Sequence, residues 1–289
     1  MRRTRTLGVT LVCAITLTGC AGVGTSRTTT TAPPATTTST IGSSTLPPVV
    51  ECPGTGDFTE GGGIATFDGE STDGSHLRRI AWETSDQCES FSFDFETSEG
   101  APATSVPPIE IDHLDSYQVI RIRMDIDAAV VTDQLVETHF VDSLYVVRAL
   151  DGEMFVDLHL REPAAARARI QTSPARLTID LRPGLVPFTG TSTIGDNVVV
   201  VSPTQDAEVT RVPVLSGYSR TFEGNVLVVV SQQGEVVAES FTTAADYLQT
   251  WGEFETALPL PEGEVSMFVG ETSPDDGSLS GVVVDVSVG

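Results

Sequence analysis

Apolar and polar residues alternate with a period of two along most of this 289-residue chain, and this pattern constrains the fold most. The alternation runs from Ser75 to about Arg182, and a second such pattern runs from Asn197 to Gly289. Successive side chains of a strand point to opposite faces, and no stretch has a sustained period of 3.6 residues. We therefore predict an all-β protein with two β-sandwich domains.

The segment Met154–Arg161 shows the alternation most clearly. Its expected core face consists of Met154, Val156, Leu158 and Leu160, and its expected opposite face of Phe155, Asp157, His159 and Arg161. Polar residues two apart on a strand are typical of a face that is open to solvent. The sequence therefore predicts a solvated surface around His159, with no catalytic role for this histidine.

The N-terminus has the features of a bacterial secretory signal. Met1–Arg5 is cationic, and Leu7–Leu17 is apolar but too short to span a bilayer. The sequence Leu17-Thr18-Gly19-Cys20 resembles a lipobox, which implies that Cys20 is lipidated and that residues 1–19 are removed. The protein is then expected on the extracytoplasmic face of the cell membrane, attached by lipid alone. The alternative is an ordinary signal peptide that contains a cysteine by chance.

Residues 20–50 are expected to form a disordered tether. Thr28–Val50 is rich in Thr, Ser and Pro and has too little apolar surface to offset the chain entropy of folding. A partly polyproline-like tether of this length spans about 90 Å. We interpret it as a stalk between the membrane and the folded part. Residues 51–74 are expected to form a loop that follows it and is joined to the first domain by a disulfide.

Four cysteines are present, of which Cys13 leaves with the signal peptide and Cys20 is lipidated. The remaining pair, Cys52 and Cys88, is expected to form a disulfide, because two cysteines of an exported protein usually pair. Closing this loop is worth about 3.8 kcal/mol on the chain-entropy description. The alternatives are two buried free thiols or a zinc pair, although the chain has no CxxC or HxxxH motif.

The end of the first alternating region carries a family resemblance. Tyr145–Pro183, and above all Pro174-Ala175-Arg176-Leu177-Thr178-Ile179-Asp180, resembles the end of an AMIN-like domain. The resemblance implies a β-sandwich over residues 75–183, of a kind that localises envelope proteins and binds peptidoglycan. No amidase catalytic domain follows it in this chain.

A hinge rich in Pro, Gly and Thr is expected at residues 184–196, before a second domain at 197–289. Seven short strands in about 92 residues fit an immunoglobulin-like sandwich. The spacing of Ser202-Pro203, Ser216-Gly217, Phe222–Val226 and Gly252-Glu253-Phe254 resembles the Gmad2 immunoglobulin-like domain. The resemblance implies a bacterial envelope or sporulation protein, and no catalytic activity is attached to this family.

The chain has 40 acidic residues against 16 basic ones, all of them Arg, and a formal net charge of −24. This charge argues against binding to nucleic acid, which needs a cationic face. The absence of Lys excludes P-loop and Schiff-base chemistry, and the four histidines have no metal-ligand spacing. We therefore predict a non-catalytic protein without cofactor or metal. The alternatives are a glycan hydrolase with unrecognised carboxylates and an accessory or sensor subunit of a membrane complex.

Arginines are concentrated near the end of the first domain, at Arg161, Arg167, Arg169, Arg176 and Arg182. Arg167 and Arg169 are two apart, so both point to one face of a strand. Guanidinium groups bind carboxylates and phosphates with two hydrogen bonds, which suggests Arg161, Arg167 and Arg169 as a site for an anionic wall ligand or an envelope protein. The alternatives are that these arginines pair with carboxylates of their own domain, or that Arg176 and Asp180 form a fixed pair.

The second domain contrasts with this stripe, because from Asn197 onward it has 14 carboxylates and two arginines. Repulsion disfavours contact with anionic wall polymers. The domain therefore suits a partner protein with a basic patch, or a spacer, and any wall binding is expected in the AMIN-like half.

Overall fold

The structure is a computed structural model that describes residues 52–289 except 53, 70–71, 86, 115–117 and 274–276. In this part of the chain every regular element is a strand, apart from one 3₁₀ turn, η2 (Phe222–Gly224). The predicted all-β class is therefore confirmed. The predicted signal peptide, the lipidation site Cys20 and the tether lie outside the described residues. No described helix is long and apolar enough to span a membrane.

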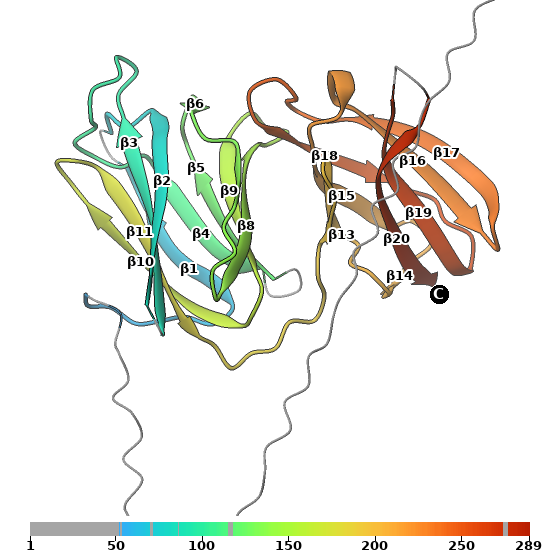
Figure 1. The fold of residues 1–289 in the computed structure, drawn as a ribbon, viewed down its shortest axis with the longest axis horizontal. Helices are drawn as coiled ribbons and strands as arrows, with labels where there is room; N and C mark the ends of the chain where they lie inside the picture. Colours follow the sequence, from blue (N-terminus) through green and yellow to red (C-terminus); the bar gives the residue numbers. More distant parts are fainter. Residues whose placement is uncertain (1–51, 53, 70–71, 86, 115–117, 274–276) are drawn as a thin grey trace, which may run out of the picture. The chain divides into compact units, whose positions relative to one another are not determined.

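Two sheets face each other in the first domain (Figure 1). One has the order β1-β4-β5-β9-β8 with β7 paired to β8, and the other has the order β10-β11-β3-β2-β6. The strands of the first sheet are β1 (Gly62–Phe67), β4 (Ile109–Leu114), β5 (Val119–Met124), β7 (Asp133–Leu135), β8 (Val141–Arg148) and β9 (Met154–Leu160). Those of the second sheet are β2 (His76–Ser85), β3 (Cys88–Glu96), β6 (Ala128–Ala129), β10 (Ala164–Gln171) and β11 (Arg176–Pro183).

The core of this domain follows the alternation of the sequence. On β3, Phe91, Phe93 and Phe95 are buried and alternate with residues that are only partly buried. Ile120 and Ile122 of β5 belong to the same apolar cluster. Burial of such large side chains removes apolar surface from water and stabilises the sandwich.

The segment 51–74 differs from the loop that we expected. Its residues Gly62–Phe67 form β1, which pairs with β4 at the edge of a sheet. The strand has two adjacent glycines and few large apolar residues, so its alternation is weak. The hinge at 184–196 is also partly ordered, because the Glu60 carboxylate accepts hydrogen bonds from the backbone N–H groups of Leu185 (2.7 Å) and Val186 (3.0 Å).

The second domain is also a pair of sheets, one with the order β18-β15-β13-β12 and one with the order β14-β20-β19-β16-β17. The first contains β12 (Thr193–Ile194), β13 (Val198–Ser202), β15 (Val214–Ser219) and β18 (Trp251–Ala257). The second contains β14 (Ala207–Val209), β16 (Asn225–Gln232), β17 (Glu235–Thr243), β19 (Gly263–Thr272) and β20 (Leu279–Val288). Valines from both sheets dominate the core between them, as expected for an immunoglobulin-like sandwich.

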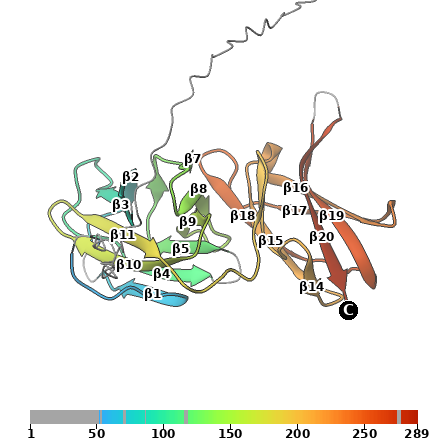
Figure 2. The same ribbon diagram turned by 60° about the horizontal axis from the view of Figure 1, so that its bottom comes forward.

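The two domains are joined by a strand pair. Trp251 and Gly252 of β18 pair in parallel with Val147 and Arg148 of β8, so one sheet runs through both domains (Figure 2). A small apolar cluster surrounds this pair and contains Tyr145, Val147, Ala149, Phe155, Val199, Val201, Tyr218 and Trp251. The outer face of the first domain's sheet is therefore covered here by the second domain.

This contact corrects the interpretation of β9. All seven residues of the strand are buried, including Phe155, Asp157 and His159. The predicted core face is confirmed, because its residues all belong to the apolar core of the first domain: Met154, Val156, Leu158 and Leu160. The opposite face is not solvated, because residues of the second domain that are distant in sequence cover it.

Candidate functional site

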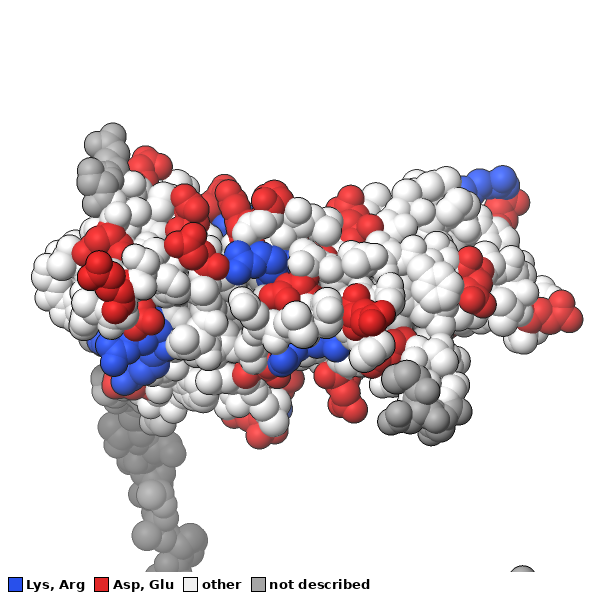
Figure 3. Space-filling model, turned by 90° about the horizontal axis from the view of Figure 1, so that it is seen from above, with Lys and Arg blue, Asp and Glu red and all other residues white. Residues whose placement is uncertain are grey.

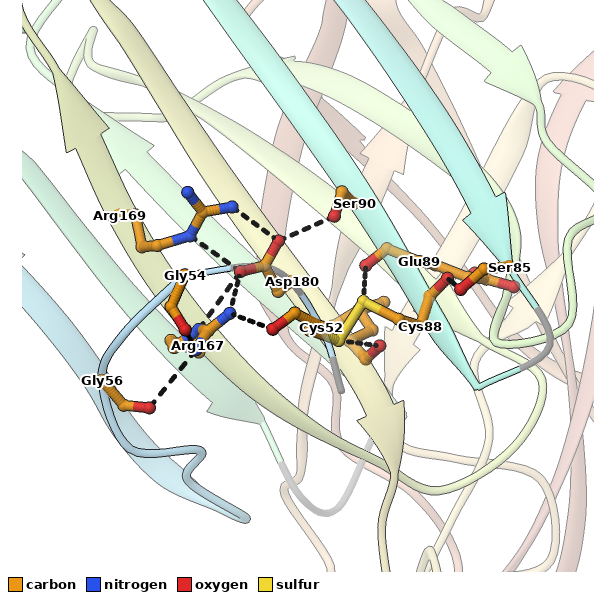
Figure 4. The surroundings of a disulfide bond; sticks show 11 residues. Cys52, Gly54, Gly56, Ser85, Cys88, Glu89, Ser90, Arg167, Arg169 and Asp180 are labelled. Carbon is orange, nitrogen blue, oxygen red and sulfur yellow. Dashed lines mark hydrogen bonds and ion pairs between the residues drawn. A yellow bond between two sulfur atoms is a disulfide. The ribbon is translucent and has the colours of Figure 1, made fainter. Parts of the chain in front are cut away.

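Two arginines of the stripe, Arg167 and Arg169, converge on one buried carboxylate (Figure 4). Asp180 is fully buried and accepts hydrogen bonds from Arg167 Nη2 at 2.7 Å and from Arg169 Nε at 2.8 Å. Ser90 Oγ donates to the same carboxylate at 2.7 Å. Burial acts to raise the pKa of Asp180, but the hydrogen bonds from Arg169, Ser90 and Arg167 outweigh it and hold the pKa below its ordinary value.

Arg167 also fastens the start of the described chain to the sandwich. Its guanidinium donates to the carbonyl oxygens of Gly54 (3.1 Å), Gly56 (3.4 Å) and Cys52 (3.5 Å). The predicted disulfide between Cys52 and Cys88 is present, with an S–S distance of 2.02 Å. Its two ends lie beside the Arg167 network in Figure 4. Arg167 is therefore a structural residue, and its side chain is only 5% exposed.

Arg161, Arg169 and Arg176 of the stripe each have a different carboxylate partner. Arg176 pairs with Asp94 at 2.6 Å, so the alternative of an Arg176–Asp180 pair is wrong. Arg169 is 35% exposed and is occupied by Asp180. Arg161 is 47% exposed and lies 3.7 Å from Asp142, an exposed partner that water also reaches. Of the three predicted ligand-binding arginines, the structure therefore leaves Arg161 with an accessible guanidinium and uses Arg167 and Arg169 inside the fold.

Arg161 lies beside a cavity of the first domain. Its Nη1 group is 3.5 Å from the carbonyl oxygen of Thr138, which lines that cavity. The cavity has a volume of about 650 Å³, and its lining consists of Trp82, Thr84, Ser85, Glu89, Glu137, Thr138 and His139. We call this the Trp82 cavity. It lies between the β2–β3 hairpin and the segment that precedes β8.

Glu89 holds the two walls of the Trp82 cavity together. Its carboxylate accepts hydrogen bonds from Thr138 Oγ1 (2.6 Å) and from the backbone N–H groups of His139 (2.6 Å) and Phe140 (3.1 Å). Trp82 is stacked on Phe91, with 6.2 Å between ring centroids. The His139 side chain is 55% exposed. The cavity thus combines an indole ring packed on the core with an accessible imidazole, and the accessible guanidinium of Arg161 lies beside it.

A second polar group is buried between the two domains. We call Arg121, Asp157, His159 and Tyr218 the junction cluster. Arg121 donates to both oxygens of Asp157, at 2.9 and 2.7 Å, and its guanidinium lies 4.0 Å from the centroid of the Phe155 ring. His159 Nε2 is hydrogen-bonded to the Tyr218 hydroxyl group. The Arg121–Asp157 pair lies within the first domain, and the His159–Tyr218 hydrogen bond crosses to the second, so the cluster joins the domains.

The junction cluster makes stability depend on pH. Burial lowers the pKa of His159 to about 4, and the positive charge of Arg121 acts in the same direction, while Asp157 opposes them. In the unfolded chain the pKa is about 6.5. Below pH 6.5 His159 therefore takes up a proton when the protein unfolds. The free energy of unfolding falls by about 1.4 kcal/mol for each unit by which the pH is lowered between pH 6.5 and 4.

Urea unfolding between pH 7 and 4.5 measures this effect. We expect the wild type to lose stability relative to His159→Gln over that range, whereas His139→Gln, which changes an exposed histidine, retains the wild-type slope. Equal slopes for the wild type and His159→Gln would contradict the assignment. The comparison between variants removes the contribution of carboxyl groups, which is common to all three proteins.

Sequence reasoning missed both the Trp82 cavity and the junction cluster. Trp82 was part of an alternating strand, and nothing in the sequence distinguished it from a core residue. Asp157 and His159 lie on a strand that the pattern identifies, but their partners Arg121 and Tyr218 lie far from them along the chain. The one local indication was the run of apolar and aromatic residues on both faces of β9.

Three described carboxyl groups have clearly shifted pKa values, Asp73, Asp180 and Asp246, and all three shifts are downward. Backbone N–H groups of Ser105 and Thr104 lower the pKa of Asp73. A glycosidase general acid needs the opposite shift, so these three groups give no support to the hydrolase alternative. Among the described residues, no group of three or more His, Cys, Asp or Glu side chains is placed to hold a metal ion.

Comparison with known proteins bears on the second domain. Residues 197–278 match the model of the Gmad2 family, described as the immunoglobulin-like domain of bacterial spore germination. The chain gave no match among curated proteins and none among solved structures. The match confirms the Gmad2 resemblance, whereas the AMIN-like resemblance of residues 75–183 stays a prediction. The second of the two β-sandwiches is thus similar to a domain of bacterial spore germination proteins.

Proposed function

We propose that this protein is a non-catalytic binding protein of the bacterial cell envelope, anchored by a lipid on Cys20, and that its first domain binds the cell wall. The anchor is inferred from the lipobox-like Leu17–Cys20, and the Gmad2 match of the second domain is compatible with a non-catalytic role. The observation that carries the proposal is the Trp82 cavity, which is lined by an aromatic ring and has an accessible arginine, Arg161, bound to the carbonyl oxygen of its wall residue Thr138.

The chemistry of peptidoglycan suits this cavity. Its sugar rings have apolar faces that pack against an indole, and ligand pockets commonly combine such aromatic surface with a few polar groups. Its peptide stems carry carboxylates, which Arg161 binds by charge-assisted hydrogen bonds. Glu89 binds the Thr138 hydroxyl and the backbone N–H of His139, so the backbone of this wall is held in place. The proposed ligand is therefore wall glycan with its peptide attached.

Sedimentation with purified cell wall tests this proposal. We expect a fragment from Pro48 to Gly289 to be retained, and Trp82→Ala and Arg161→Ala each to weaken retention about tenfold or more, since each removes a contact worth about 1–3 kcal/mol. Higher salt is expected to weaken retention as well, because Arg161 is exposed.

Arg78→Ala is the matched control for Arg161→Ala. Arg78 is 54% exposed and lies 3.8 Å from Glu96, so its exposure and pairing are close to those of Arg161, but Glu96 does not line the cavity, whereas Arg161 contacts the lining residue Thr138. Its substitution is expected to leave retention unchanged. Retention of both cavity variants at the wild-type level would overturn the proposed site. Release of soluble glycan fragments by the wild type would favour the hydrolase alternative.

A further inference from the structure

Strand β17 forms one edge of the sheet β14-β20-β19-β16-β17 in the second domain (Figure 1). In the described part of the chain it pairs with β16 and with no other strand. It has nine residues, whereas β14 at the opposite edge has three. Val236 is 66% exposed and Phe241 is 64% exposed. A long, exposed edge of this kind is a template for pairing with another strand.

The part of β17 that is regular enough to pair runs from Ala238 to Thr243. The register with β16 shifts next to Val236, and such bulges interrupt pairing. From Ala238 onward the register is continuous. In an antiparallel ladder, alternate residues direct their backbone N–H and C=O groups away from the partner strand. Half of the backbone groups of this stretch therefore point to the open edge.

Apolar side chains lie on the outer face of the same sheet, on β20, β19, β16 and β17. Phe241 lies opposite Leu227 of β16, and Glu239 lies opposite Val229. On the next strands, Phe268 of β19 and Val283 of β20 continue this face. Ala238 is on the inner face and packs against the core. A strand added to β17 would thus place alternate side chains beside Phe241 and Glu239.

The negative charge of this edge favours a basic binding partner. Both arginines of the second domain are already paired, Arg211 with Glu262 and Arg220 with Asp133. The β17 strand carries Glu235 and Glu239 and no basic residue. On the face seen in Figure 3, acidic side chains outnumber basic ones. A second copy of β17 would bring further glutamates to the edge, and like charges on paired strands are destabilising.

We propose that β17 binds an extended, basic segment of a partner protein, which adds to the sheet as a further strand. The segment carries a Lys or Arg that faces Glu239 and, two residues away on the same face, an apolar side chain that packs on Phe241. Main-chain hydrogen bonds supply affinity, and these two side-chain contacts supply selectivity. This inference is independent of the proposed wall binding, because it concerns a different domain.

Fluorescence anisotropy with the full chain tests the proposal. The probe is a labelled ten-residue peptide in which Lys and Val alternate along one face and Thr occupies the other. One comparison peptide has Glu in place of Lys. Another has every backbone nitrogen methylated, which keeps its charge but removes its ability to donate to a strand ladder. We expect the Lys peptide to bind, and both comparison peptides to bind at least tenfold more weakly.

Variants of the protein locate the binding edge. Glu239→Gln is expected to weaken the Lys peptide about two- to fivefold, the range of a single exposed ion pair, and Glu239→Lys is expected to reverse the preference toward the Glu peptide. Phe241→Ser weakens both peptides. Glu208→Gln is the matched control, because Glu208 is an exposed glutamate on β14, at the other edge of the same sheet. It is expected to have no effect.

Several results would overturn the proposal. These are no binding of the Lys peptide at millimolar concentration, equal binding of the methylated peptide, or an equal effect of Glu208→Gln and Glu239→Gln. Sedimentation velocity gives a further result that would overturn it. If the wild type forms a dimer and Phe241→Ser abolishes that dimer, the edge binds a second copy of this chain.

Discussion

Asp180→Ala is expected to destabilise the protein by about 3–5 kcal/mol, the typical cost of removing one partner from a buried ion pair. The substitution leaves Arg167, which is 5% exposed, without the carboxylate that neutralises it. Because Arg167 also binds the backbone carbonyl groups of Cys52, Gly54 and Gly56, we expect these residues to loosen together with the sheet. Urea unfolding followed by circular dichroism measures the free energy of unfolding of the variant and the wild type.

Asp94→Ala is the matched control for this prediction. Asp94 also forms ion pairs with two arginines, Arg176 at 2.6 Å and Arg79 at 3.7 Å, but its side chain is 21% exposed and both arginines reach solvent. Its loss is expected to cost about 1 kcal/mol or less, as for exposed ion pairs. If the two variants are destabilised equally, burial is not what makes the Asp180 network important.

Trp251→Ala is expected to separate the unfolding of the two domains. Trp251 is 3% exposed, its ring centroid lies 4.9 Å from that of Tyr145, and it belongs to the strand pair between β18 and β8. Removing a buried aromatic side chain costs about 3–5 kcal/mol. Since Trp251 packs between the domains, we expect much of the lost free energy to come from the interaction that makes the two domains unfold together. We expect one calorimetric transition for the wild type and two for the variant.

Phe222→Ala is the control for the calorimetric experiment. Phe222 is an aromatic residue of the same domain, but it is 59% exposed and is not part of the junction. Its substitution is expected to leave a single transition near the wild-type temperature. Two transitions in the wild type itself would mean that the junction does not couple the domains, and would contradict the interpretation of Trp251.

Much of the fold was predictable because it depends on local pattern. The alternation of Phe91, Phe93 and Phe95 with smaller polar residues predicts a strand with one buried face, and β3 has it. The pairing of Cys52 with Cys88 followed from elimination of the other two cysteines. Strand β1 was missed, since its glycines give no alternation and its ordering comes from pairing with β4.

The candidate site was predictable only in part. Arg161, Arg167 and Arg169 were identified by residue type and spacing, which is the same for a ligand site and for an internal ion pair. Asp180 lies beyond the β10–β11 turn, and the register that places it opposite Arg167 decides between the two. Arg161 is the accessible member because it follows the end of β9 and its carboxylate partner, Asp142, is itself exposed.

By itself, the sequence determined the all-β class, the disulfide and the similarity of residues 197–278 to Gmad2. These depend on side-chain periodicity, on a count of cysteines and on spacing within one domain. The tertiary structure alone decided that His159 is buried, that Arg167 is neutralised and that Trp82 lines a cavity. The physical reason is that a period of two separates the faces of a strand but does not say what covers each face. That depends on segments distant in sequence, here β18 against β8 and the residues before β8 against the β2–β3 hairpin.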